Sequence, residues 1–129
     1  MTVTDKISRK KLDERLSDFK SSNQVYLHRL SESWKMLLSE GCFFVRESAD
    51  AYWLFDLILS YQSSSALIGV TMQRWNIRKM RRGQLQIMCV SRKGDVLIAK
   101  TEKRKFVLDD LTIYVIGNYA RLKSEYLHE

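Results

Sequence analysis

Residues 51–62 read AYWLFDLILSYQ, which is the most apolar stretch of the chain. Trp53, Leu57 and Tyr61 recur at the spacing of one helical face, and apolar side chains occupy most of the other positions as well. A helix that is apolar on nearly every side is typical of a buried position. The pattern therefore predicts a central helix over residues 49–61 that the rest of the domain covers.

The residues before this helix predict a second helix and a strand. Ser39 is placed to cap the N-terminus of a helix, and Ser48 offers a second cap, so we expect a helical pair over residues 39–62. The segment 24–30, QVYLHRL, alternates in the manner of a strand. Residues 1–20 carry apolar side chains at helical spacing, which predicts an amphipathic N-terminal helix.

The second half of the chain changes to the period of β-strands. Apolar and polar side chains alternate in several short runs within residues 70–127, and turns such as Gly117-Asn118 separate them. Because helices come first and strands follow, the sequence predicts a single α+β domain over residues 1–129. The expected architecture is an antiparallel β-meander of about five strands, packed on one face against the central apolar helix. We expect Trp75 to face that helix, and the alternative is an exposed ring between Arg74 and Arg78 on which a nucleobase could stack.

Basic residues are concentrated in the second half of the chain. Residues 1–62 hold nine Lys and Arg against nine Asp and Glu, whereas residues 63–129 hold thirteen against six and so carry the whole net charge of +7. We expect the hairpin tips to lie on one side, because strands joined by hairpins are usually neighbours, and the basic residues would then form one positive surface for an acidic partner. The alternative is that they keep the hairpins soluble and discourage edge pairing. The candidate binding face consists of Arg74, Arg78, Lys79, Arg81, Arg82, Arg92, Lys93, Lys103, Arg104 and Lys105.

Groups suited to catalysis are scarce. The chain has two histidines, His28 and His128, and no phosphate-binding loop, nucleophile elbow or zinc motif. Cys42 and Cys89 match no metal-ligand spacing, so we expect free, buried thiols. We therefore predict no enzyme activity, no cofactor and no metal. A contact between Asp56 and His28 is expected to be structural, and an enzyme that uses this pair is a third hypothesis.

The sequence also indicates where the protein works. No stretch is apolar and long enough for a membrane span, and the N-terminus lacks the apolar segment of a secretory signal. Two unpaired cysteines are typical of a reducing compartment. These features predict a cytoplasmic protein that has no membrane partner.

Segments spread over residues 19–127 resemble a family of small bacterial, cyanobacterial, plasmid and phage proteins of unknown function. The most specific match is the helix, which fits the family signature A-Y-W-L-x-D-x-I-x-S-x-Q. The resemblance implies a small stand-alone domain that often accompanies mobile elements, and it implies no established activity. The chain departs from the family pattern in having no proline and in its basic hairpins. The residues of the resemblance, expected to be structural, are Tyr26, His28, Gly41, Ala51, Tyr52, Trp53, Asp56, Ile58, Gln62, Trp75, Glu125 and Tyr126.

The leading hypothesis is a small, non-catalytic, cytoplasmic module that contacts nucleic acid or an acidic protein surface through its basic β-hairpins. The alternative is a protein–protein adaptor or inhibitor, encoded by a mobile element or phage, that acts on a host or defence complex. No small-molecule ligand is indicated, and the sequence carries no signal for an oligomeric state.

Overall fold

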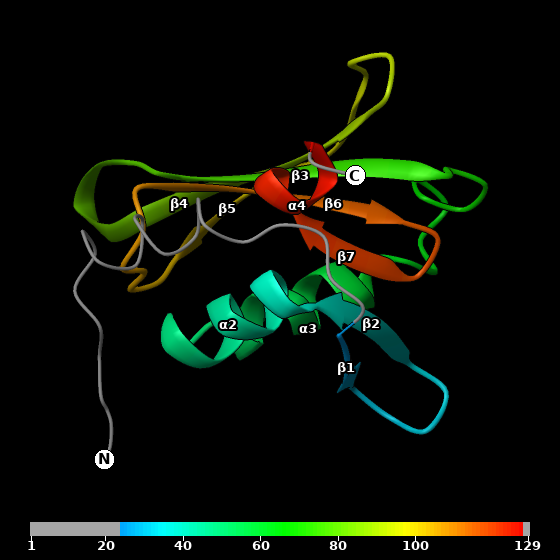
Figure 1. Ribbon diagram of the computed structural model, residues 1–129. Helices are drawn as coiled ribbons and strands as arrows, with labels where there is room; N and C mark the ends of the chain where they lie inside the picture. Colours follow the sequence, from blue (N-terminus) through cyan, green and yellow to red (C-terminus); the bar gives the residue numbers. More distant parts are fainter. Residues whose placement is uncertain (1–23, 128–129) are drawn as a thin grey trace.

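A computed structural model describes residues 24–127, which form one sheet with short helices on both of its faces (Figure 1). The predicted N-terminal helix over residues 1–20 lies outside the described residues. The strands are β1 (Val25–Arg29), β2 (Lys35–Ser39), β3 (Met72–Lys79), β4 (Gln84–Ser91), β5 (Val96–Lys103), β6 (Asp110–Ile116) and β7 (Tyr119–Leu122). The helices are α2 (Glu40–Ser48), α3 (Tyr52–Ser60) and α4 (Lys123–Leu127), and a 3₁₀ turn, η1, covers Arg81–Gly83.

The strands of the described residues form a seven-stranded mixed sheet in the order β1-β2-β7-β6-β3-β4-β5. Strand β2 runs parallel to β7, whereas the other neighbouring strands are antiparallel. The expected antiparallel meander of about five strands is therefore wrong. Strands β1 and β2 extend the sheet at one edge, and β6 returns to the middle beside β3 instead of continuing past β5.

Burial explains why β6 lies in the middle of the sheet and β5 at its edge. Leu111, Ile113 and Val115 of β6 are buried at alternate positions, so this strand needs cover on one whole face. The side chains of β5 are only half-buried or exposed, as suits an edge strand. The loop from β5 back to β6 buries Phe106 and Leu108, which ties this connection to the core.

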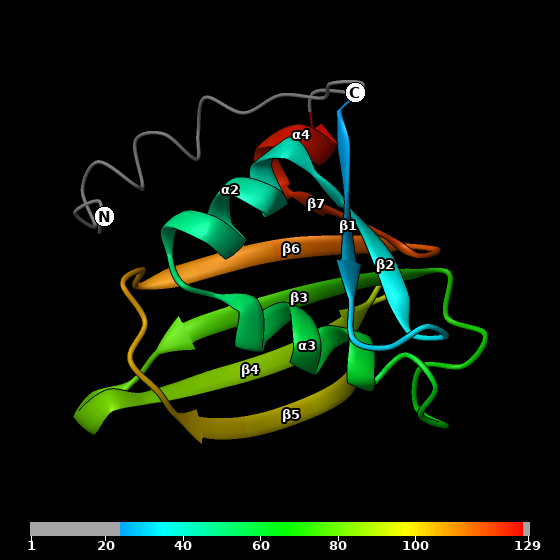
Figure 2. The same ribbon diagram turned by 90° about the horizontal axis from the view of Figure 1, so that it is seen from below.

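Two short helices, and not one long central helix, cover the inner face of the sheet (Figure 2). Helix α2 ends where Asp50 takes a φ of 54° and the N–H of Ala51 donates to the carbonyl of Arg46 at 3.1 Å. This left-handed turn closes α2 and redirects the chain into α3. The expected central helix over residues 49–61 is therefore shorter than predicted, at Tyr52–Ser60, and α2 is the other helix of the pair expected over residues 39–62.

The helix caps differ from one helix to the other. Ser39 caps α2 as predicted, because its hydroxyl accepts a hydrogen bond from the N–H of Cys42 at 3.1 Å. Ser48 does not cap α3, since it is the last residue of α2 and α3 begins at Tyr52. Within the described residues, no helix has both the length and the apolar character needed to span a bilayer.

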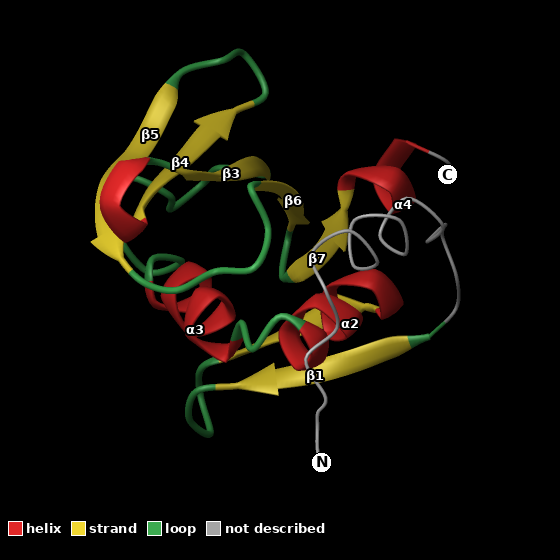
Figure 3. Cartoon of the chain, turned by 90° about the vertical axis from the view of Figure 1, so that its left-hand side faces the viewer, coloured by secondary structure: helices red, strands yellow, loops and turns green. Residues whose placement is uncertain are grey.

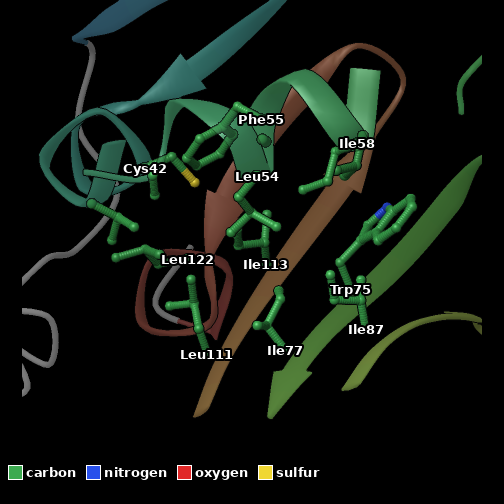
Figure 4. Close-up of a cluster of buried hydrophobic side chains, with 14 of the residues drawn as sticks. Cys42, Leu54, Phe55, Ile58, Trp75, Ile77, Ile87, Leu111, Ile113 and Leu122 are labelled. Carbon is green, nitrogen blue, oxygen red and sulfur yellow. The ribbon is translucent and has the colours of Figure 1, made fainter. Parts of the chain in front are cut away.

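The core lies between these two helices and the inner face of the sheet (Figure 4). Leu54 of α3 points toward Ile113 of β6, and Ile58 points toward Trp75 of β3. All four side chains are completely buried, which confirms that Trp75 faces the helix. Burial of such a side chain contributes about 2–3 kcal/mol. The apolar stretch at residues 51–62 therefore anchors the sheet, as its composition predicts.

The last described element is a helix, α4, although residues 70–127 were expected to be strands. It lies on the sheet face opposite α2 and α3 (Figure 1). Its buried Glu125 accepts hydrogen bonds from the N–H of Gly41 at 2.9 Å and the N–H of Leu122 at 2.8 Å, and the hydroxyl of Ser39 donates to the same carboxylate. The carboxylate thus occupies the positive N-terminal end of α2.

Replacing Gly41 with Ala tests this contact. In the middle of an ordinary helix, a change from Gly to Ala raises the free energy of unfolding by about 0.5–1 kcal/mol, because Ala has the higher helix propensity. Here the added methyl carbon would lie 2.6 Å from Cδ1 of Leu122 and 2.8 Å from Oε1 of Glu125. We expect Gly41→Ala to lower the free energy of unfolding by about 2 kcal/mol, as measured by urea denaturation. A variant as stable as the wild type would contradict the close approach of α4 to α2.

Candidate functional site

The face of the sheet opposite α2 and α3, which we call the outer face, carries a groove of about 450 Å³. We call it the outer groove. It crosses β3, β4 and β6, and α4 lies beside β6 and β7 (Figure 3). Asn76, Gln86 and Thr112 provide polar side chains in its lining. Arg74 and Arg78, two members of the predicted binding face, lie in the same groove.

Strand alternation directs the two arginines to the outer face. Trp75 and Ile77 of β3 point into the core, so Arg74, which precedes them, and Arg78, which follows them, point the other way. Arg78 lies directly across from Asp110 of β6 in the strand register. The fold therefore presents the arginines on an open sheet surface, with their backbone held by strands on both sides.

The groove is positively charged. Among the described residues, Arg74, Arg78 and Lys123 line it together with one carboxylate, that of Asp110, so three positive charges face one negative charge. A guanidinium presents its N–H groups in a planar fork that matches the oxygens of a phosphate or a carboxylate. The geometry thus suits a ligand that carries several negative charges.

An aromatic cluster borders the groove at α4. The ring of Tyr114 of β6 stacks on Tyr126 of α4, with centroids 4.4 Å and planes 14° apart. The guanidinium of Arg121 lies over Tyr119 and Tyr126, at 5.3 and 5.5 Å from the ring centroids. These contacts hold α4, and with it Lys123, against the outer face.

The predicted binding face missed two basic residues of this region, Lys123 and Arg121. Both follow the basic hairpins in the chain. The position of β6 between β3 and β7 brings Lys123 into the groove of Arg74 and places Arg121 opposite Tyr114 of β6. The available signal was the excess of basic residues in the second half of the chain. That excess gives no information on which strands are neighbours.

The other predicted basic residues lie at the ends of the hairpins. One group gathers around η1, where the N–H of Arg104 donates to the carbonyl of Gly83 at 3.1 Å and Lys79 pairs with Asp109 at 3.8 Å. Lys79, Arg81, Arg82, Lys103, Arg104 and Lys105 belong to this end.

Arg92 and Lys93 lie in the turn between β4 and β5, at the other end of the hairpin (Figure 1). Successive turns of antiparallel strands alternate between the two ends, so these two residues cannot join the group at η1. The structure therefore divides the ten predicted residues among the outer groove and two separate hairpin ends.

Arg104 turns its side chain away from the outer face. Its Nε donates to Glu102 at 2.6 Å, and its guanidinium lies over the ring of Trp53, 4.6 Å from the centroid. Lys100 also pairs with Glu102, at 3.2 Å. Burial alone would raise the pKa of Glu102, but the hydrogen bonds from Arg104 and Lys100 lower it below its usual value. These residues border a second groove of about 410 Å³ between α3 and β5, which Asp56 also lines.

Asp56 forms the predicted contact with His28. Oδ1 of Asp56 lies 2.8 Å from Nε2 of the buried His28, and Nη1 of Arg46 lies 3.0 Å from Nδ1 of the same ring. Because a guanidinium only donates, Nδ1 accepts and Nε2 carries the proton that is donated to Asp56. Burial lowers the pKa of His28 more than the hydrogen bond and charge of Asp56 raise it, and the charge of Arg46 lowers it further.

Arg46 connects three elements through this contact. It also donates to the carbonyl of Leu27 at 3.3 Å and pairs with Glu47 at 3.0 Å, and its guanidinium lies 4.6 Å from the ring centroid of Tyr52. Helix α2 is thereby joined to β1 and α3. The histidine and the aspartate belong to this connection between elements.

The other residues of the family resemblance lie in the interior or at contacts between elements. Nε1 of Trp75 donates to Gln73 at 2.9 Å, and the amides of Gln73 and Gln62 exchange hydrogen bonds at 2.8 and 3.0 Å. Tyr26 stacks on Phe43 with centroids 3.9 Å apart. Gly41, Ala51, Ile58 and Glu125 are buried, and Tyr52 and Tyr126 form the ring contacts described above.

The cysteines are free and buried, as predicted. Burial raises the pKa of Cys89 to about 12 and also raises the pKa of Cys42. Since the thiolate is the nucleophilic form, both thiols are poorly reactive. Residues 24–127 contain no group of three or more His, Cys, Asp or Glu side chains arranged to hold a metal ion.

The model of a family of unknown function (DUF6876) matches residues 10–126 of the chain. No curated protein and no solved structure matches it.

The environment of His28 predicts a stability that depends on pH. The folded protein disfavours the protonated imidazole, whereas the unfolded chain takes up the proton near the ordinary pKa of 6.5. The neutral His28 therefore contributes its full stabilisation above pH 6.5. This stabilisation is lost as the pH falls through the lower pKa of His28 in the folded protein. We expect the free energy of unfolding to fall between about pH 7.5 and about pH 5, and His28→Gln to reduce that slope in urea denaturation.

The pKa of His28 itself provides the independent check, because NMR titration of the wild type reports it without any substitution. A folded-state pKa above 6.5, or the same pH slope in His28→Gln as in the wild type, would contradict the burial of a neutral imidazole.

Proposed function

The chain belongs to this family of unknown function, DUF6876, and we propose that it is a non-catalytic module that binds nucleic acid on the outer face of its sheet. The observation that carries the proposal is the outer groove, where Arg74, Arg78 and Lys123 surround a polar floor. Sheet surfaces with basic and aromatic side chains are a recurrent means of binding nucleic acid chains. The net charge of +7 would attract such a polyanion over a longer range.

A nucleic acid fits the groove better than an acidic protein surface does. An acidic protein would use the arginines and the lysine, but it has no general need for the amide groups of Asn76 and Gln86 between them. A nucleotide has both a phosphate for the cations and a base with donors and acceptors for the amides. The mixture of charge and amides in one groove therefore favours nucleic acid.

A binding role is also favoured over catalysis by the side chains that line this groove. Neither His nor Cys is among the described residues of its lining. The buried histidine lies on the inner side, where Arg46 and Asp56 occupy both of its ring nitrogens. We propose that the module works in the cytoplasm, in keeping with its two buried free thiols.

A second candidate is a protein adaptor or inhibitor carried by a mobile element or phage. The observation that favours it is the second groove, between α3 and β5, where apolar Trp53 and Leu57 lie beside Asp56 and Glu102. Mixed apolar and charged surfaces of this kind are common in protein interfaces. A stoichiometric protein partner whose binding is abolished by Trp53→Ala and unaffected by changes in the outer groove would favour this candidate.

Removal of the two arginines tests the proposed nucleic-acid face. We expect Arg74→Ser with Arg78→Ser to weaken the binding of a labelled oligonucleotide about tenfold in fluorescence anisotropy. The slope of log affinity against log salt should become shallower by about two, because each arginine neutralises about one phosphate. Stability should change little, because Arg78 is exposed and Arg74 is half-buried on the outer face, and charges at the surface contribute about 0–1 kcal/mol.

The matched control is Arg29→Ser with Lys35→Ser, which removes the same number of charges. These two exposed residues face each other in the β1–β2 hairpin, at the sheet edge away from the groove. The control should retain most of the affinity and salt slope. Equal losses in the two double variants would mean that net charge alone drives binding, and the proposed face would then be wrong.

A further inference from the structure

The amides and the hydroxyl of the outer groove form a layer that can recognise hydrogen-bonding groups. Oδ1 of Asn76 accepts a hydrogen bond from Oγ1 of Thr112 at 3.1 Å. This bond engages the amide oxygen of Asn76, so its NH₂ group is the part that is left to donate to a ligand. Gln86 of β4 lies in the same groove and offers a second amide.

Apolar and aromatic surface lies next to these amides. Met88 is the neighbour of Asn76 in the register of β3 and β4, and Tyr114 lines the groove from β6. The ring of Tyr114 is held in place by its stack on Tyr126. A ligand that complements this surface has a flat apolar body and a polar edge, which is the chemistry of a nucleobase.

The three cations complete the match to a nucleotide. Arg74, Arg78 and Lys123 lie around the amides, and a phosphate would be within the same groove of about 450 Å³ as the base attached to it. A cavity of this size holds a ligand of the size of one nucleotide.

The shape of the site selects an unpaired base. In a duplex the bases are stacked, and their edges are reached only by a helix or β-ribbon that projects into a groove of the nucleic acid. Here the amides lie on the floor of a groove in a sheet, with α4 beside it and the β4–β5 turn projecting on the same side (Figures 1 and 3). Only a base that leaves its stack can reach Asn76 and Gln86.

We propose that the outer groove binds single-stranded nucleic acid and seats one unpaired base on Asn76 and Gln86, with its phosphates on Arg74, Arg78 and Lys123. The inference rests on the proposed function and narrows it to one class of nucleic acid. The affinity then has two separate parts. The cations bind phosphate, so their part of the affinity falls as the salt concentration rises. The amides bind the base, and their part of the affinity does not depend on salt.

The experiment uses the full chain and three fluorescein-labelled probes of about 12 nucleotides, a length at the scale of single-strand sites. The probes are a mixed-sequence single strand, its duplex, and an abasic strand with the same number of phosphates. At equal salt, the single strand should bind about tenfold more tightly than either of the other two. The double variant Asn76→Ala with Gln86→Ala should lose about tenfold affinity for the single strand, with an unchanged salt slope, and should bind the abasic strand as the wild type does.

Gln86→Ala alone provides a second variant if the double variant folds poorly, and Asn118→Ala, in the exposed β6–β7 turn, is the matched amide control. Duplex or abasic strand that binds as tightly as the single strand would overturn the seating of a base while leaving nucleic-acid binding intact. Full affinity of the amide variants for the single strand would also overturn it. Absence of salt-sensitive binding to all three probes would refute the proposed function itself.

Discussion

The carboxylate of Glu125 joins the last described helix, α4, to the start of α2. It binds the first turn of α2 through the N–H of Gly41, 84 residues away in sequence, and through the cap residue Ser39, 86 residues away. A buried carboxylate is stable only when hydrogen bonds replace its water, and these donors, with the N–H of Leu122, supply them. The parallel pairing of β2 with β7 lies beside this contact. The same carboxylate also places α4, which brings Lys123 to the outer groove.

The sheet separates stability from binding by the alternation of its side chains. In β3, Trp75 and Ile77 fill the core, while Arg74, Asn76 and Arg78 face outward. Because the inner residues fix the strand, the outer ones are held at defined spacings without having to pack. The outer face can therefore carry a net positive charge that would be costly in the core.

The sequence predicts local features of this fold well and long-range pairing poorly. The apolar helix around Trp53, the cap at Ser39 and the inward Trp75 follow from the spacing of neighbouring residues. Residues 35–39 form β2, although their apolar side chains do not alternate with a clear period of two. This strand pairs with β7, and no local sequence pattern indicates that pairing. The order of β5 and β6 likewise depends on which strand buries more apolar surface.

The candidate site was predictable only in part for the same reason. Arg74 and Arg78 could be assigned to an outward face from the alternation of one strand. Lys123 reaches the groove because β6 and β7 place α4 beside it. The spacing of residues in the sequence does not indicate where α4 packs. The hairpin ends were expected on one side because strands joined by hairpins are usually neighbours, but successive turns occupy opposite ends of a sheet.

The parallel contact of β2 with β7 has a consequence for the order in which the protein folds. Leu38 pairs with Ala120, so the β1–β2 hairpin is complete long before the strand that receives it has been synthesised. The β3–β4–β5 hairpins, whose contacts are local, form early, because short loops close at a smaller entropic cost. Until β7 is made, β2 exposes an unpaired edge, and the nascent chain is then open to association with other chains. The closing of the sheet, and with it the assembly of the outer groove, is therefore a late step of folding.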